Sequence, residues 1–285
     1  MYKRQVENIV SRLAIHYGNN PTVIGWQIDN EPGHYGVVDY SENAQAKFRI
    51  WLQKKYGTID KLNDTWGASF WSETYQNFEQ VRLPNQQEVP DKANPHAMLD
   101  LNRFMADELA GFVNMQADIL RRHIHKDQWI TTNLIPIFNP VDPVRIDHPD
   151  FLTYTRYLVT GHNQGIGSQG FRMGIPEDLG FSNDQFRNRV GKAFGVMELQ
   201  PGQVNWGVYN PQPLPGAIRM WVYHVFAGGG KFVCNYRFRQ PLKGSEQYHY
   251  GMIMTDGVTL SPGGEEYVRI TPVSYTHLRA HETRH

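Results

Sequence analysis

Apolar residues recur every three to four positions in several parts of the chain, and this spacing predicts helices. The predicted helices cover residues 6–17, 48–56, 59–66, 95–119 and 218–226. Start and stop signals support these boundaries, since Gly57 follows the second helix, Asn94-Pro95 opens the long fourth one, and Gly228-Gly229-Gly230 ends the last. The first helix has one apolar face, which consists of Val6, Ile9, Val10, Leu13 and Tyr17.

Short apolar runs rich in β-branched and aromatic residues lie between the helices, and they predict strands. These runs are Thr22–Ile28, Trp129–Ile135, Phe151–Leu158, Ala193–Leu199 and Lys231–Tyr236. Each of the five predicted strands is followed by a helix or a long loop, which is the rhythm of a parallel α/β fold. The chain shows no repeat period and no low-complexity linker.

The composition excludes several classes of protein. With 285 residues, 40% of them hydrophobic, the chain can bury a full core. Lys and Arg number 28, as do Asp and Glu, so the net charge is zero and gives no electrostatic reason to expect nucleic acid or a membrane surface as a partner. The sequence contains no run of eighteen apolar residues, and residues 1–20 have the periodicity expected of a helix instead of the pattern of a signal peptide. The single cysteine, Cys234, allows neither an internal disulfide nor a cysteine cage for zinc.

Two carboxylates stand where predicted strands run out. Glu31 follows the first strand in VIGWQIDNEPGHYG, and Glu198 ends the strand in AFGVMELQPG. Catalytic residues of β/α barrels lie at this carboxyl end of the strands. Two carboxylates across a pocket suit retaining glycoside hydrolysis, in which one protonates the leaving oxygen and the other attacks the anomeric carbon. Either acid alone would be read as an ordinary surface charge, but the pair, with Asn30 beside it to bind a sugar hydroxyl, favours the catalytic interpretation.

Several separated segments together resemble the β-galactosidases of glycoside hydrolase family 42, over most of residues 1–270. IGWQIDNEPG is similar to the acid/base segment of the family, and MELQPGQVNWG is similar to the nucleophile segment. The resemblance therefore implies that Glu31 is the acid/base and Glu198 the nucleophile, that Asn30 binds the sugar, and that Trp206 forms a wall of the galactose pocket.

Two further segments carry the same resemblance. GSEQYHYG is similar to the last sugar-binding element of the family, which implies that Glu246 and His249 contact galactose hydroxyls. These two residues are three apart, so they share a face only if their loop turns helically. WGASFWSETYQNFEQVRLP also resembles the family, and Trp71 within it and Tyr157 are candidates for the pocket floor. Plain core packing is the alternative for each of these aromatic residues, Trp206 included.

The resemblance also implies what kind of protein this is. The family's catalytic domain is a (β/α)8 TIM barrel, and its acid/base residue follows the fourth strand. The chain is therefore expected to hold about strands 4 to 8, an incomplete barrel, with residues 1–272 forming the C-terminal part of the catalytic domain. The resemblance implies that the full-length protein from which this chain would come is a homo-oligomer, a trimer as in the family. We expect it to be bacterial and cytoplasmic, with secretion as the open alternative. The cysteine cluster that binds zinc in some members is absent from HYGVVDYSEN, so we expect no metal and no cofactor.

Two other motifs are weaker. GIGSQG, residues 165–170, matches the dinucleotide fingerprint, but Gly174 and Pro176 interrupt the helix that should follow, so we interpret it as a loop. HETRH, at residues 281–285, matches a zinc-peptidase pattern with no room for a third ligand. The tail from residue 273 onwards breaks with the rest of the chain and resembles translated vector sequence, so we expect it to be non-native and disordered.

The predicted function is removal of terminal non-reducing β-D-galactose from a β-galactoside with retention of configuration. The alternative is a carbohydrate-binding protein without turnover, and a zinc peptidase is a distant third. For the first function we expect an ionised Glu198 and a Glu31 protonated near neutral pH, its pKa raised to about 6–7 by the charge of its partner. The two carboxyl groups should lie roughly 5–5.5 Å apart.

Overall fold

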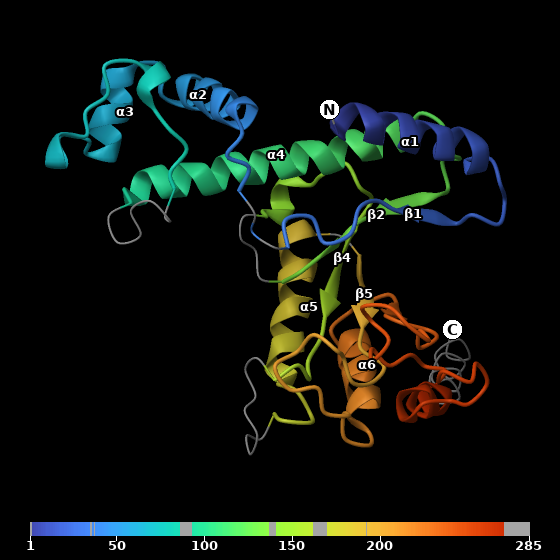
Figure 1. Cartoon of the computed structure of the whole chain (residues 1–285). Coiled ribbons are helices and arrows are strands. Elements are labelled where there is room, and N and C mark those ends of the chain that lie inside the picture. The colour runs from blue at the N-terminus through green and yellow to red at the C-terminus, as the bar shows by residue number, and fades with distance from the viewer. Residues whose placement is uncertain are drawn as a thin grey trace, which may run out of the picture. The chain divides into compact units, whose positions relative to one another are not determined.

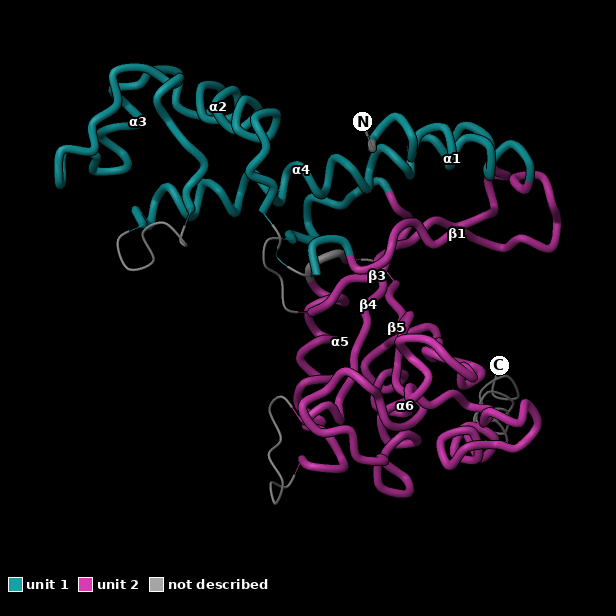
Figure 2. The backbone as a smooth tube through the Cα atoms, viewed as in Figure 1, with its two compact units in different colours: residues 1–16, 32–123, 137–148 teal, residues 17–31, 124–136, 149–285 magenta. Residues whose placement is uncertain are grey.

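The computed structural model describes residues 2–34, 36, 38–85, 93–136, 141–161, 170–191 and 193–270 (Figure 1). Its chain forms two compact units (Figure 2). Unit 1 comprises Met1–His16, Pro32–His123 and Ile137–His148, and unit 2 comprises Tyr17–Glu31, Ile124–Pro136 and Pro149–His285. Both candidate acids belong to unit 2, so the proposed site can be described within one unit.

Unit 1 is helical. Its helices are α1 (Tyr2–Tyr17), α2 (Glu42–Tyr56), α3 (Ile59–Trp66) and α4 (Pro95–Arg121), with 3-10 turns at Phe70–Ser72, Phe78–Gln80 and Pro143–Arg145. Capping side chains define the starts of three of them, because Ser41, Thr58 and Asn94 each accept a hydrogen bond from a backbone N–H of the first turn. Gly57 and Gly67, both at positive φ, end α2 and α3. All four helices were predicted, although α2 begins six residues before the predicted position.

The core of unit 1 lies between α2, α3 and α4. Residues four apart on α2 face α3 and α4, and they pack with Leu62, Trp66, Leu101 and Phe104 into one apolar cluster. The α2 members of this cluster are Ala44, Phe48, Leu52 and Tyr56. The expected apolar face of α1 behaves differently, since Ile9 is 58% and Leu13 45% exposed.

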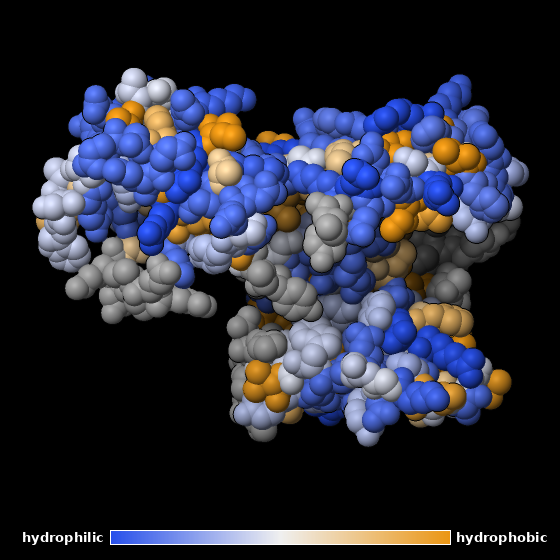
Figure 3. Space-filling model, turned by 45° about the horizontal axis from the view of Figure 1, so that its top comes forward, coloured by the Kyte–Doolittle hydropathy of each residue, from blue (hydrophilic) through white to orange (hydrophobic). Residues whose placement is uncertain are grey.

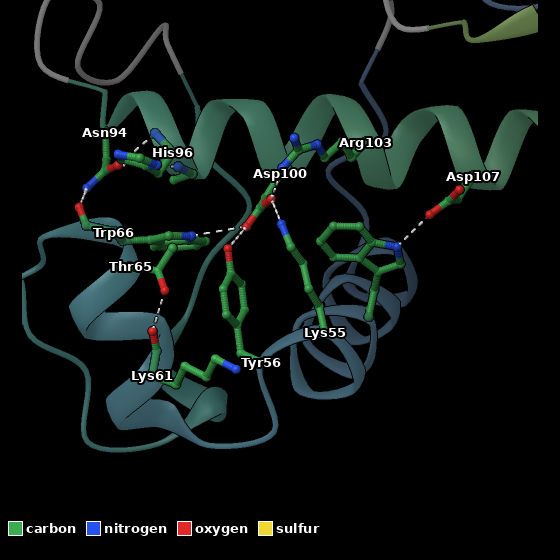
Figure 4. Close-up of polar contacts among 12 residues, drawn as sticks. Lys55, Tyr56, Lys61, Thr65, Trp66, Asn94, His96, Asp100, Arg103 and Asp107 are labelled. Atoms are coloured by element: carbon green, nitrogen blue, oxygen red, sulfur yellow. Dashed lines mark hydrogen bonds and ion pairs between the residues drawn. The ribbon is translucent and has the colours of Figure 1, made fainter. Parts of the chain in front are cut away.

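A carboxylate is buried beside this core. Asp100 on α4 is 1% exposed, and it accepts hydrogen bonds from Tyr56 Oη at 2.5 Å and Trp66 Nε1 at 3.1 Å (Figure 4). It also pairs with Lys55 and, at 3.5 Å, with Arg103. Asp100 therefore joins all three helices through one side chain.

Unit 2 contains the parallel sheets. Its strands are β1 (Gly25–Gln27), β2 (Trp129–Thr131), β3 (Asn133–Leu134), β4 (Leu152–Arg156), β5 (Phe194–Leu199) and β6 (Val233–Asn235). One sheet has the order β1-β2 and the other β3-β4-β5-β6, and every pairing within them is parallel. Helices α5 (Pro176–Val190) and α6 (Ala217–Ala227) and a helical segment at residues 262–270 belong to the same unit. The predicted parallel α/β fold is thus confirmed.

Two details of unit 2 differ from the predictions. The predicted strand at 129–135 is interrupted at Thr132 and forms β2 and β3. Helix α5 is absent from the predictions, which interpret Gly174 and Pro176 as interrupting a helix in this region. In the structure Pro176 occupies the first helical turn, where no N–H is needed, and Glu177 and Asp178 follow it there.

Large apolar side chains are exposed on both units, and hydrophobic groups lie between hydrophilic ones on the face shown in Figure 3. No helix of the described part is long and apolar enough to cross a membrane. Within the same residues, no group of three or more His, Cys, Asp or Glu could hold a metal ion. The tail at 273–285, with its HETRH motif, and the glycine motif at 165–170, apart from Gly170, lie outside the described residues.

Candidate active site

The first acid lies on a strained loop beyond a strand. β1 ends at Gln27, and the ladder continues for one bond, from Ile28 N–H to Thr131 O at 2.8 Å. Asp29 and Glu31 then adopt positive φ angles of 52° and 48°. Non-glycine residues with this backbone are uncommon and cluster at functional sites. Glu31 therefore stands four residues past the end of β1, one more than the predicted strand end at Ile28 implies.

The face of the sheet on which the second acid lies is set by an irregularity in β5. Tyr154 of β4 pairs with Val196, but the next residue, Thr155, pairs with Glu198. Met197 is the extra residue, and such a bulge reverses which side chains point to a given face. Glu198 therefore lies on the same face of the sheet as Thr155. In an unbroken ladder it would lie on the opposite face.

Asn133 connects the loop of the first acid to the sheet. This fully buried β3 residue accepts hydrogen bonds at Oδ1 from Gln27 Nε2 at 2.9 Å and from the backbone N–H of Glu31 at 3.3 Å. Its Nδ2 donates to Asn30 Oδ1 at 3.0 Å and to Thr155 Oγ1 at 2.8 Å. One amide side chain thus positions both Asn30 and Glu31.

The pKa of Glu31 is raised from 4.5 to about 7. Burial is the largest cause and the charge of Glu198 the second, while a hydrogen bond from the Thr155 side chain lowers the pKa. The direction agrees with the prediction, but burial, which disfavours the charged carboxylate, contributes more than the partner charge that we expected to dominate. Near neutral pH a large share of Glu31 is protonated.

The pKa of Glu198 is also raised, first by burial and then by the charge of Glu246. Tyr157 opposes both, because its hydroxyl donates to Glu198 Oε2 at 2.7 Å and this bond lowers the pKa. The charge of Glu198 in turn raises the pKa of Glu31. The two acids are therefore electrostatically coupled, and an ionised Glu198 favours the protonated form of Glu31.

Two further aromatic rings contact Tyr157, the residue that binds Glu198. The ring of Tyr157 lies edge-to-face with Trp206 at a centroid distance of 5.0 Å and with His249 at 5.8 Å. Trp206 is 46% exposed, so a large part of its surface is open to a ligand. A flat, partly open indole next to Tyr157, which binds Glu198, suits the apolar face of a pyranose.

Glu246 lies in a turn next to this cluster. Its Oε2 accepts hydrogen bonds from Tyr236 Oη at 2.7 Å and from Arg237 Nη1 at 2.9 Å. A hydrogen bond from His249 N–H to Glu246 O at 2.9 Å closes the turn. The loop therefore makes the turn that the two residues need in order to share a face. His249 itself is fully buried, and its Nε2 donates to Tyr236 O at 3.1 Å. In this structure His249 is hydrogen-bonded to the backbone carbonyls of Tyr236 and Glu246. Its direct contact with sugar stays a prediction.

The predicted residues Glu31, Asn30, Glu198, Tyr157, Trp206, Glu246 and His249 all belong to unit 2. Trp71 belongs to unit 1, where it is 63% exposed, has a φ of 56° and lies 5.0 Å from Phe70 between ring centroids. Its place in the pocket stays a prediction.

Four residues of the site were not predicted, namely Asn133, Thr155, Tyr236 and Arg237. Tyr236 and Arg237 follow β6, so the rule that located the two acids at strand ends could have found them. Asn133 gave a weaker signal, as a polar residue inside an apolar run. Thr155 gave none, because threonine is ordinary in a strand.

The sequence profile of the glycoside hydrolase family 42 described as β-galactosidase matches residues 1–272. The chain belongs to this family. Its members are retaining glycosidases. The β-galactosidase Bga of Halorubrum lacusprofundi is 36% identical over 262 residues, and BgaA of a Thermus species is 36% identical over 263 residues; each match covers 90% of this chain. The crystal structure of the β-galactosidase from Marinomonas ef1 superposes with a TM-score of 0.87 at 33% identity, over 96% of this chain.

The matched region is only part of each relative. This family 42 chain spans 37% of the Halorubrum protein, 40% of the Thermus protein and 42% of the Marinomonas chain. The resemblance stated from sequence motifs is therefore confirmed for the family and for a partial catalytic region.

Proposed function

We propose that this chain carries the acid/base, the nucleophile and part of the sugar pocket of a retaining β-galactosidase. The observation that carries the proposal is the pair Glu31 and Glu198, which lie in one unit and are electrostatically coupled, since burial and the charge of Glu198 raise the pKa of Glu31 to about 7. A carboxyl group that keeps its proton near neutral pH beside an ionised one is what a pair of acid and nucleophile requires.

In the first step Glu198 bonds to the anomeric carbon while the glycosidic C–O bond breaks, and Glu31 gives its proton to the leaving oxygen. In the second step water attacks the same carbon from the other face. Glu31 takes the proton from that water, and the bond between sugar and Glu198 breaks. Glu31 must therefore donate a proton first and accept one later, and a pKa of about 7 allows both near neutral pH.

The pocket residues support a galactose substrate. Trp206 offers an indole face to the ring, and Asn30 and Glu246 offer polar groups to hydroxyls. Glu246 is itself held by Tyr236 and Arg237, so its orientation is set before a sugar binds. A pocket with positioned polar groups rejects an epimer whose hydroxyl leaves them without partners. The relatives named β-galactosidase support galactose as the sugar that is accepted.

The test uses the protein encoded by the complete reading frame around this chain, here called the extended protein, and an aryl β-galactoside. In Glu198→Gly, hydrolysis should stop and azide should restore turnover by attacking the face where Glu198 stood, which gives the α-galactosyl azide. In Glu31→Gly, azide should attack the galactosyl-enzyme from the opposite face and give the β-azide. The two anomers, distinguished by NMR, assign the two roles independently.

Some outcomes contradict this proposal. A first product of inverted configuration from the unsubstituted extended protein would exclude the retaining mechanism, and equal rates on glucosides and galactosides would exclude the galactose assignment. The partial coverage of the relatives favours a second candidate, sugar binding without turnover. Calorimetric binding of galactose by an extended protein that hydrolyses nothing would support that candidate instead.

A further inference from the structure

The ladder between β4 and β5 ends just before the site. Arg156 and Leu199 are the last pair in register, so Tyr157, the next residue along the chain, lies beyond the sheet. Its hydroxyl nevertheless donates to Glu198 Oε2 at 2.7 Å. A contact other than the backbone ladder must therefore hold the segment after β4 in place.

The side chain of Gln200 replaces the ladder beyond this point. Its Oε1 accepts hydrogen bonds from the backbone N–H groups of Leu158 at 2.6 Å and Val159 at 2.7 Å. Its Nε2 donates to Val159 O at 3.2 Å and to Gly202 O at 2.9 Å. Because backbone N–H groups only donate and carbonyls only accept, these partners determine which end of the amide is the oxygen.

Gln200 is fully buried, and its four hydrogen bonds use the whole capacity of a side-chain amide. Leu158 and Val159 are buried as well, so their N–H groups would have no water to bind if the amide were removed. Pro201 follows Gln200, and a residue before proline is restricted to extended backbone. The Gln200 amide is therefore a well-defined bridge between the two segments.

Both ends of this bridge lie next to the contact between Tyr157 and Glu198. Leu158 is the residue after Tyr157, and Gln200 is two residues after Glu198. We propose that Gln200 is a positioning residue: it holds the backbone beyond β4 so that the Tyr157 hydroxyl stays within hydrogen-bonding distance of Glu198. The inference rests on the proposed function only for the role of Glu198 as nucleophile, since the hydrogen bonds hold without it.

Loss of the bridge should change the ionisation of Glu198. The bond from Tyr157 lowers the pKa of Glu198, while burial raises it. The other ionisable groups that interact with this carboxyl are Glu31, Glu246 and Tyr236. Gln200 has no hydrogen-bonding capacity left for them, so its removal should act on Glu198 through Tyr157.

The experiment measures the pKa of Glu198 in the extended protein. Infrared titration of protein labelled with 13C at the Glu carboxyls follows ionisation, and the band lost in Glu198→Gln identifies the group. In Gln200→Met, which keeps the length of the side chain but loses all four bonds, the pKa of Glu198 should rise by about half to one pH unit, because the bond from Tyr157 weakens. Gln200→Asn keeps the amide but is one methylene shorter. It should act in the same direction, and it decides the test if Gln200→Met does not fold.

A double-mutant cycle shows whether Gln200 acts through Tyr157. Tyr157→Phe alone should raise the pKa of Glu198. Adding Gln200→Met to Tyr157→Phe should cause no further rise, because the bond that Gln200 positions is already absent. A further rise as large as the one in the unsubstituted protein would overturn the inference.

Gln128→Met is the matched control. Gln128 is also buried in unit 2, where it accepts a hydrogen bond from Trp26 Nε1 at 2.9 Å and donates to Val23 O at 2.8 Å, near the start of β1. This substitution should leave the pKa of Glu198 unchanged. An unchanged pKa in the Gln200 variants that fold, or an equal rise in Gln128→Met, would overturn the inference. An extended protein that shows the expected shifts but hydrolyses no galactoside would support this inference and refute the proposed function, so the two fail separately.

Discussion

Glu198 lies between groups that act on its ionisation in opposite directions. Burial and the charge of Glu246 raise its pKa, and the hydroxyl of Tyr157 lowers it through a bond of 2.7 Å. A nucleophile must be ionised to attack, so its pKa sets the acid limit of activity. Tyr157 is therefore expected to extend activity towards low pH, in addition to any contact with substrate.

We predict that Tyr157→Phe moves the acid limb of the pH profile of kcat/KM upwards by about one pH unit. The sign follows from the bond, because its loss raises the pKa of Glu198 and leaves less carboxylate at any pH below the new value. Tyr154→Phe is the control, since it removes a hydroxyl three residues earlier, on β4, that donates at 2.7 Å to Asn183. The measurement is the pH–rate profile of the extended protein. A limb that stays in place, or moves downwards, would contradict the role given to Tyr157.

At the scale of elements, the buried carboxylate of Asp100 links helices α2, α3 and α4 of unit 1. Burial acts to raise the pKa of Asp100, but hydrogen bonds from Lys55, Tyr56 and Trp66 outweigh it, and the pKa lies below its ordinary value of 3.8. Removing one partner from a buried ion pair leaves the other charge uncompensated. Asp100 therefore stabilises the packing of α2 and α3 on α4.

We predict that Asp100→Ala lowers the free energy of unfolding by about 3–5 kcal/mol. Asp118→Ala is the control, since Asp118 lies on the same helix but is about half exposed and pairs with His148 at the surface; it should cost about 1 kcal/mol or less. Urea unfolding followed by tryptophan fluorescence measures both. Equal effects of the two substitutions would contradict the prediction.

The same contact gives a pH dependence with a definite sign. Because the pKa of Asp100 is lower in the folded than in the unfolded chain, its contribution is fully present above the unfolded value and is lost as the pH falls through the folded one. The difference between wild type and Asp100→Ala should therefore shrink below about pH 4.

Element ends were predictable from the sequence where a local signal decides them. Asn94 and Gly57 act as caps through their own chemistry, and the two acids lie near strand ends because parallel strands share one carboxyl edge. The face of Glu198 was not predictable, because it depends on the bulge at Met197, which exists only through pairing with β4. Asn133 was missed for the same reason, because its role depends on contacts that are distant in the sequence. Three of its four hydrogen bonds join it to residues more than a hundred positions away, and the fourth joins it to Thr155, 22 positions away.

At the scale of the whole molecule, several large apolar side chains are exposed to solvent. Ile9 and Leu13 lie four apart on α1 and are 58% and 45% exposed, and Ile24, just before β1, is 70% exposed. Burial of a large apolar side chain stabilises a protein by about 1.5–3 kcal/mol, while total stability is only about 5–15 kcal/mol. A few such positions therefore affect whether residues 1–285 remain folded and monomeric when expressed by themselves.

We predict that residues 1–285 expressed alone self-associate, bind a hydrophobic dye and do not hydrolyse galactosides. Exposed apolar stripes favour contact between copies, and catalytic carboxylates need placement within about 0.5 Å, which a loosely held sheet does not maintain. The double substitution Ile9→Gln and Leu13→Gln should reduce dye binding and apparent mass, because it removes apolar surface without emptying the core. Arg12→Gln on the same helix is the control and should change neither. Light scattering and dye fluorescence give the measurement, and a monomeric chain with a cooperative melting transition and ordinary turnover would show that these exposed residues do not limit the molecule.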